Sequence, residues 1–185
     1  DLQPDPRILP MLGEINLSQW KCAAELIDNS IDGFLSVVRA GGDLREAEIQ
    51  VLTPLNEDPG GRFVVIDNGP GMSPEVLEQA VRAGWSGHDP VSSLGMFGMG
   101  FNIATARLGT VTSVFTTRSG DPEWVGLKID FDQLRTQRHF RTPRLSEPKH
   151  DPNQHGTRVV VERQKPEQRQ WFAKSGNRTK MQNEL

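Results

Sequence analysis

The chain of 185 residues is long enough for one domain with a substantial core, and its composition is that of an ordinary globular protein. Hydrophobic residues make up 35% and charged residues 24%, which excludes a disordered, collagen-like or coiled-coil chain. No apolar run approaches the roughly 18 residues that a membrane-spanning helix needs, and the first residues show no signal-peptide pattern, so no membrane partner is expected. Cys22 is the single cysteine, which excludes a disulfide scaffold and favours a cytoplasmic location.

Charge is distributed unevenly along the chain. Residues 1–162 hold 15 basic and 22 acidic side chains, whereas residues 163–185 hold six basic and two acidic ones. The acidic main part is not suited to attract nucleic acid by charge. The basic C-terminal segment could contact phosphate, but a solvent-exposed helical face explains its positive charge equally well. Whether nucleic acid is a partner therefore stays an open question.

The first strong pattern follows an irregular, proline-containing segment over residues 1–17. Ser18 is a suitable N-cap for a helix that ends at Gly41 and Gly42. Apolar residues recur at helical spacing within it and predict a buried stripe. That stripe is expected to contain Ala23, Leu26, Ile27, Ile31, Phe34 and Leu35.

The remaining elements alternate between strands and helices. Strands are expected at 48–55, 62–67, 110–118, 123–130 and 157–163. Ser73 and Pro74 predict a helix that ends near residue 82, and a second helix is expected over 98–108. The glycine- and serine-rich residues 84–98 predict a mobile loop, and residues 136–155 are polar and ambiguous. A basic helix without an obvious place in the core is expected from Pro166 onward.

One face of the first long helix carries chemically active side chains. Glu25, Asn29 and Asp32 are spaced i, i+4 and i+7, which places them within roughly 40° of one line. Asp28, Asn29 and Ser30 are poor helix-interior residues, so their presence there needs a reason. A solvated polar face is an equally good reading of these residues alone.

Two further motifs follow. In the segment VVIDNGPGM an apolar strand ends at Asp67, and Gly69 and Gly71 permit a sharp turn and the close approach of a flat ligand. A carboxylate held in this way suits an exocyclic amine such as that of adenine, although a plain strand-to-helix turn fits equally well. The segment GMFGMG, residues 95–100, precedes a helix and could present backbone N–H groups to phosphate, but it matches neither the P-loop nor the Rossmann pattern.

Taken together, these motifs closely resemble the ATP-binding domain of the GHKL superfamily. That group contains the gyrase B subunit, the ninety-kilodalton heat-shock chaperones, MutL proteins, sensor histidine kinases and the MORC ATPases. AAELIDNSIDGF is similar to the first motif of the superfamily, VIDNGPGM to the second and GMFGMGF to the third, while His155, Gly156 and Thr157 resemble a fourth. The resemblance covers residues 18–163, and the first and third motifs look most like those of MORC or heat-shock chaperone sequences.

The resemblance implies an α/β two-layer sandwich of the Bergerat type, with a mixed, mostly antiparallel sheet and helices on one face. It implies that Asn29 holds Mg²⁺, that Asp67 binds the adenine amine of ATP or ADP, and that Thr157 joins a water network with Asp67. Asp32 would orient its neighbours or the ribose side of the site. The other nucleotide contacts implied by the motifs are Gly69, Gly71 and Met72 near the base, and Gly95, Phe97, Gly98, Met99, Gly100 and Phe101 around the phosphates.

Glu25 distinguishes the branches of the superfamily. Hydrolysing members carry a glutamate one turn before the Mg²⁺-binding asparagine, and sensor histidine kinases usually lack it, so the resemblance implies ATP hydrolysis with Glu25 as the catalytic base. A histidine kinase-type domain and a non-hydrolysing nucleotide sensor remain alternatives.

The expected organisation is an N-terminal segment at 1–17 that serves as a possible dimerisation arm, the ATP-binding domain at 18–163, and a basic segment at 164–185 that connects to a further region. The domain would act as an ATP-dependent homodimerisation switch in a longer protein and would turn over slowly in isolation.

Overall fold

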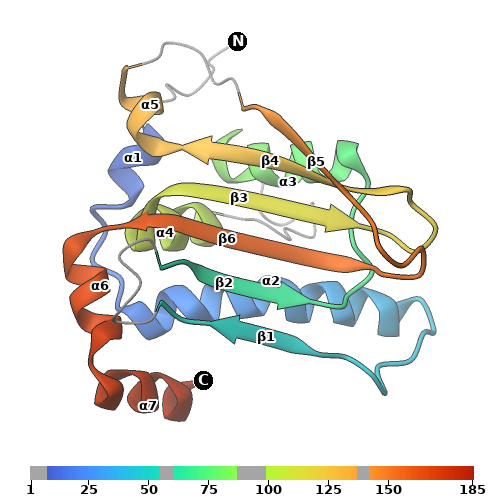
Figure 1. The fold of residues 1–185 in the computed structure, drawn as a ribbon, viewed down its shortest axis with the longest axis horizontal. Helices are drawn as coiled ribbons and strands as arrows, with labels where there is room; N and C mark the ends of the chain where they lie inside the picture. Colours follow the sequence, from blue (N-terminus) through green and yellow to red (C-terminus); the bar gives the residue numbers. More distant parts are fainter. Residues whose placement is uncertain (1–7, 55–60, 87–98, 137–141) are drawn as a thin grey trace.

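A six-stranded sheet forms one layer of the molecule, and helices form the other (Figure 1). The computed structural model describes residues 8–54, 61–86, 99–136 and 142–185. The strands are β1 (Ile49–Leu52), β2 (Phe63–Asp67), β3 (Gly109–Thr117), β4 (Glu123–Asp130), β5 (Arg144–Pro148) and β6 (Gly156–Gln164). Their order is β1-β2-β6-β3-β4-β5, and every pairing within the described residues is antiparallel. The expected two-layer α/β fold is therefore confirmed, but the sheet, expected to be mixed and mostly antiparallel, is antiparallel in all its described pairings.

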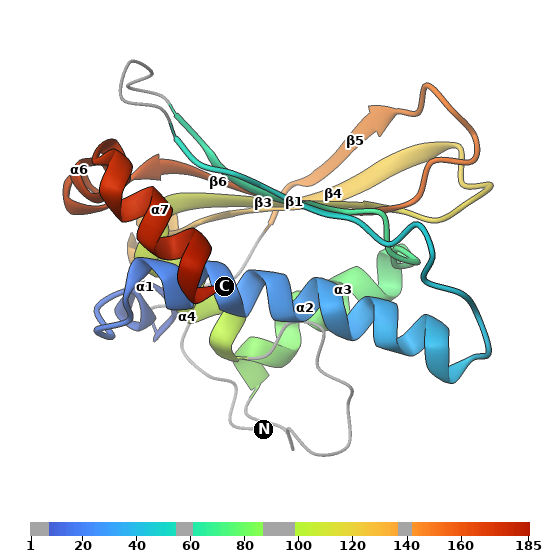
Figure 2. The ribbon, with the colours of Figure 1, turned by 90° about the horizontal axis from the view of Figure 1, so that it is seen from below.

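The helical layer covers one face of the sheet, as Figure 2 shows for α2, α3 and α4. The helices are α1 (Ile8–Leu12), α2 (Gln19–Arg39), α3 (Pro74–Ser86), α4 (Met99–Leu108), α5 (Phe131–Thr136), α6 (Pro166–Ala173) and α7 (Ser175–Glu184). Helix α2 packs beside α4 under the central strands. None of the helices in the described ranges is long and apolar enough to cross a membrane.

Apolar residues at every second position of the strands form the core between the two layers. Phe63 and Val65 of β2 join Val159 and Val161 of β6 in the main cluster of buried apolar residues, because residues two apart share one face of a strand. Cys22 of α2 belongs to the same cluster, and burial raises the pKa of its thiol to about 12. This thiol is therefore a core side chain rather than a nucleophile.

The buried face of α2 differs from the expected stripe. The residues that it buries are Cys22, Ala23, Leu26, Ser30, Gly33 and Phe34. The expectation was wrong for Ile31 and Leu35, which are 41% and 40% exposed, and Ile27 is only half-buried. Apolar residues occupy more than one side of this helix, and the side that carries the small residues Ser30 and Gly33 is the one that faces the other elements.

Several boundaries also differ from the expectation. Helix α3 continues to Ser86, four residues past its expected end, while residues 87–98 of the expected loop lie outside the described residues. The segment 1–17 contains the short helix α1, and the ambiguous segment 136–155 contains strand β5. Ser18 occupies the N-cap position of α2, but its hydroxyl makes no capping hydrogen bond.

The C-terminal helices are part of the core, which corrects the expectation that they have no place in it. Phe172 of α6 is fully buried, and its ring centroid lies 5.5 Å from that of Phe63 in β2. Met181 of α7 is 3% exposed and belongs to the same cluster. The basic side chains of Lys174 and Lys180 face solvent. The polar composition of this segment concealed two apolar side chains that anchor both helices in the core.

Replacing Phe172 by alanine should therefore destabilise the fold. Loss of a buried phenylalanine typically costs about 3–5 kcal/mol because it leaves a cavity. Urea unfolding followed by circular dichroism measures this cost, and Gln170→Ala, an exposed position of the same helix, is the matched control. A Phe172→Ala variant within about 1 kcal/mol of the unmodified protein would show that α6 does not contribute to the core.

Candidate functional site

Three neighbouring strands bring Asp67, Thr157 and Thr116 side by side. Asp67 is the last residue of β2 and pairs with Thr157 of β6, which in turn pairs with Thr116 of β3. All three residues are two positions from core valines of their own strands, namely Val65, Val159 and Val114, so they share the helix-covered face. The row therefore lies at the edge of the core, beneath α2.

The carboxylate of Asp67 is buried and held by three donors. Its Oδ1 accepts hydrogen bonds from the backbone N–H of Gly69, at 2.9 Å, and of Thr157, at 3.1 Å. Its Oδ2 accepts the hydroxyl proton of Ser30 from α2, at 2.8 Å. Burial raises the pKa of Asp67 above its usual value, and the three hydrogen bonds together with His155 oppose that rise.

Thr116 links the strand row to the turn after β2. Its hydroxyl accepts a hydrogen bond from the backbone N–H of Met72, at 2.9 Å, and donates to the carbonyl of Gly156, at 3.0 Å. The hydroxyl of Thr157 lies 3.4 Å from it. Thr116 is fully buried, so these bonds form away from water and fix the turn relative to β6.

The turn between β2 and α3 requires glycine at position 71. Gly71 has a φ of 68°, in the left-handed region, and a side-chain carbon at this position would collide with the carbonyl oxygen of Thr117. Asn68 fixes the other side of the turn, because it donates to the carbonyl of Glu46 and accepts from the N–H of Glu48. The turn is therefore held rigidly beside Asp67.

Glu25 and Asn29 lie at the other end of the site. A side-chain carbon at Gly100 would collide with the carboxylate of Glu25, so this carboxylate lies directly against the first turn of α4. The amide nitrogen of Asn29 donates to the carbonyl of Glu25 at 2.6 Å. Within the part of the chain that the structure describes, neither Oδ1 of Asn29 nor the carboxylate of Glu25 has a hydrogen-bonding partner. No described residue therefore competes with a ligand for either group.

The other site residues expected from the motifs lie in different environments. Met72 and Phe101 are buried in the main cluster, and Met99 is 58% exposed at the first position of α4. Asp32 is exposed. Gly95, Phe97 and Gly98 lie outside the described residues.

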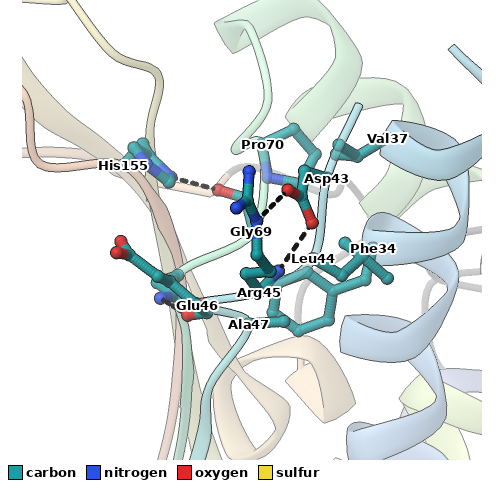
Figure 3. Close-up of a pocket in the computed structure, with 11 residues that line it drawn as sticks. Phe34, Val37, Asp43, Leu44, Arg45, Glu46, Ala47, Gly69, Pro70 and His155 are labelled. Carbon is teal, nitrogen blue, oxygen red and sulfur yellow. Dashed lines mark hydrogen bonds and ion pairs between the residues drawn. The ribbon is translucent and has the colours of Figure 1, made fainter. Parts of the chain in front are cut away.

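Two cavities border the Asp67 end of the site. The larger, of about 580 Å³, has apolar walls from Phe34, Leu44 and Pro70, and Figure 3 shows the ion pair between Asp43 and Arg45 across its rim. The smaller, of about 360 Å³, has Asp67 in its lining but lies on the other face of the sheet, because Ile66 and Arg158, which alternate with Asp67 and Thr157 along their strands, also line it. His155 lines both cavities, and its Nδ1 lies 2.8 Å from the carbonyl oxygen of Gly69 (Figure 3). Neither cavity is lined by Glu25 or Asn29, so both lie away from the Glu25 end.

Three residues at the site were not assigned a role from the sequence. Ser30, Thr116 and His155 hold the Asp67 carboxylate or the turn beside it. The signal for Ser30 was its unfavourable position in mid-helix, and the signal for His155 was its place in the fourth motif. Nothing in the sequence around Thr116 distinguishes it from the other threonines of β3.

The chemistry of the site fits a nucleotide with a hard cation. Asp67 has a carboxylate oxygen that can accept a donor from a base, and Asn29 and Glu25 offer oxygen atoms at the other end of the site. Within the described ranges no group of three histidine, cysteine or acidic side chains is arranged to hold a metal ion by itself. This donor set suits Mg²⁺, which takes few protein ligands and completes its shell with water and substrate phosphate.

Comparison with known proteins agrees with this geometry. The model of a family described as histidine kinase-, DNA gyrase B-, and HSP90-like ATPase matches residues 17–157. Protein MICRORCHIDIA 7 of Arabidopsis thaliana is 32% identical over 120 residues, which are 62% of this chain and 16% of that protein. Protein MICRORCHIDIA 4 of the same plant is 34% identical over 95 residues, or 50% of this chain and 11% of that protein. The chain spans less than a fifth of the length of these relatives.

Replacing Thr116 by valine should loosen the site without changing its shape. The substitution leaves the N–H of Met72 and the carbonyl of Gly156 without their partner, which costs about 1–3 kcal/mol of the free energy of unfolding. Thr112→Val is the matched control, because Thr112 is also fully buried in β3 but its hydroxyl has no partner among the described residues. Equal stabilities of the two variants in urea unfolding would contradict the role given to Thr116.

Proposed function

The chain belongs to the histidine kinase-, DNA gyrase B- and HSP90-like ATPase family, and on this premise we propose that it binds ATP with Mg²⁺ and hydrolyses it as a switch within a longer protein. Membership of this GHKL-type family and the likeness to MICRORCHIDIA proteins make it a MORC-like ATP-binding domain. The dependence on Mg²⁺, the hydrolysis step and the switch are the proposed part.

The observation that carries the proposal is the position of Glu25. Its carboxylate lies against Gly100 at the start of α4 and one helical turn before Asn29 in α2. The N–H groups in the first turn of a helix have no partners within that helix and attract phosphate. A carboxylate, a metal-binding amide and a phosphate-binding helix end therefore lie close together.

This arrangement suits in-line attack of water on the γ-phosphorus. The carboxylate of Glu25 accepts a proton from the water as its oxygen bonds to that phosphorus, and the bond from the γ-phosphorus to the β,γ-bridging oxygen breaks. The products are ADP and inorganic phosphate. The backbone N–H groups of the first turn of α4 stabilise the negative charge that develops on the transferred phosphoryl group.

Asn29 is the residue that would hold the metal ion. Its amide nitrogen is fixed on the carbonyl of Glu25, which leaves the amide oxygen to coordinate the cation. Bound Mg²⁺ would neutralise charge on the β- and γ-phosphate oxygens. The short hydrogen bond holds Asn29 in one rotamer, so its oxygen is positioned before the ligand binds.

The wider role of the domain follows as part of the same proposal. ATP binding would bring two copies of the longer protein together, and hydrolysis would release them. A nucleic-acid partner through the basic segment or a further region, and a cytoplasmic location, stay predictions of the sequence.

Neutralising Glu25 should separate binding from turnover. Glu25→Gln should retain ATP affinity within about a factor of three, while phosphate release by the longer protein falls by about 10²–10⁴ because the general base is lost. Asp28→Asn removes an exposed carboxylate of the same helix and should leave turnover unchanged. Unchanged phosphate release by Glu25→Gln would refute the assigned base. Transfer of labelled phosphate to a protein histidine would instead support the histidine kinase reading.

Removing the amide of Asn29 should abolish the contribution of Mg²⁺ to binding. Asn29→Ala is expected to lower the affinity for Mg²⁺-ATP on the order of ten-fold or more, with a smaller effect on ATP measured in EDTA. Titration calorimetry with and without Mg²⁺ gives both values. Asn177→Ala is the matched control, because that amide also donates to a backbone carbonyl but lies in α7. If Mg²⁺ raises the ATP affinity of Asn29→Ala as much as it raises that of the unmodified protein, Asn29 does not bind the metal ion.

A further inference from the structure

We infer that Ser30 is a positioning residue that makes this site select adenine over guanine nucleotides, an inference that rests on the proposed function. The inference comes from the hydrogen bonds of the Asp67 carboxylate, in which the two oxygens have different partners.

The two oxygens of Asp67 differ in their capacity to bind a ligand. Each carboxylate oxygen has two lone pairs. Oδ1 accepts from the N–H groups of Gly69 and Thr157, so both of its lone pairs are used. Within the described part of the chain, Oδ2 accepts only the hydroxyl of Ser30, so one lone pair remains. Oδ2 is therefore the oxygen that can accept a donor from a base.

Ser30 acts on that same oxygen from the opposite layer of the fold. Helical serines often bond to a carbonyl of their own helix, as Ser36 does with the carbonyl of Gly33 at 2.6 Å. Ser30 instead faces the sheet, is 7% exposed and donates across to β2. The bond fixes the rotation of the Asp67 carboxylate about its last torsion, so the free lone pair has one direction.

The same bond keeps the carboxylate an acceptor. The 6-position of adenine carries an amine that donates, whereas guanine carries an oxygen that accepts. An ionised Asp67 attracts the first and repels the second. Burial raises the pKa of Asp67, and the hydrogen bonds from Gly69, Ser30 and Thr157 to the ionised form, with the nearby His155, lower it. Loss of the Ser30 hydroxyl removes one of these lowering influences, so at a given pH more of the carboxyl is protonated.

A protonated carboxyl can donate to guanine and no longer offers adenine its best acceptor. ATP affinity should therefore fall on the acid side of its pH profile as Asp67 takes up a proton. In Ser30→Ala this fall should begin at a higher pH, and the preference for ATP over GTP should shrink. A purely structural role of Ser30 would lower the affinity for both nucleotides equally and leave the pH profile in place.

The test measures dissociation constants for ATP and GTP with this protein from about pH 5 to about pH 8, with Mg²⁺ held constant. At the pH where the ATP affinity of the unmodified protein begins to fall, Ser30→Ala is expected to bind ATP about ten-fold more weakly and to lose a similar factor of its preference over GTP, because a hydrogen bond to a charged group is lost. Ser30→Thr keeps the hydroxyl and should restore most of the preference. Ser36→Ala, which removes a hydroxyl of the same helix that bonds only within it, should match the unmodified protein.

The outcomes separate this inference from the proposed function. Failure of the unmodified protein to bind ATP at any pH would overturn the proposed function. Normal ATP binding together with an unchanged pH profile and ATP/GTP ratio in Ser30→Ala would overturn the role of Ser30 alone.

Alanine is the strongest helix former, so the variant should fold, and circular dichroism checks this. Ser30→Cys, whose thiol is a weak donor, should shift both readouts in the same direction by a smaller factor and provides the same test if Ser30→Ala does not fold.

Discussion

The buried carboxylate of Asp67 is the interaction on which the rest of the site depends. A charged group taken out of water is tolerated only when hydrogen bonds replace its hydration. Here the replacement comes from three separate parts of the chain: Ser30 of α2, the turn at Gly69 and the start of β6 at Thr157. The carboxylate therefore joins the helical layer to the sheet at the point where a base would bind, and any ligand there acts on all three segments.

Helix α2 serves both ends of the site through adjacent residues. Asn29 bonds to Glu25 and Ser30 bonds to Asp67, since successive helical residues point about 100° apart. The cost is a run of poor helix formers in the middle of the longest helix. Burial of Leu26 and Phe34 on either side of that run offsets the cost. A movement of this one helix would act on the Glu25 end and the Asp67 end together, as the proposed nucleotide-driven switch requires.

The Glu25 end of the site depends on close approach rather than on charge pairing. Gly100 lets the Glu25 carboxylate lie against the first turn of α4, where any larger residue would displace it. The core beneath this contact includes Phe101 of α4 and Phe172 of α6. The C-terminal helices thus help to hold the layer on which Glu25, Asn29 and Gly100 are carried, although their sequence is mostly polar and basic.

The sequence by itself determined the fold class and the positions of most of the elements, because hydrophobic periodicity and glycine motifs are local patterns, while the roles of Glu25, Asn29 and Asp67 stay predictions of the family resemblance. Only the tertiary structure decided which side of α2 is buried, since Ile31 and Leu35 are as apolar as the residues that face the sheet. It also placed Phe172 in the core and brought Ser30 and Thr116 to the site. Each of these depends on contacts between segments distant in the chain, and a local pattern carries no information about which partner lies opposite.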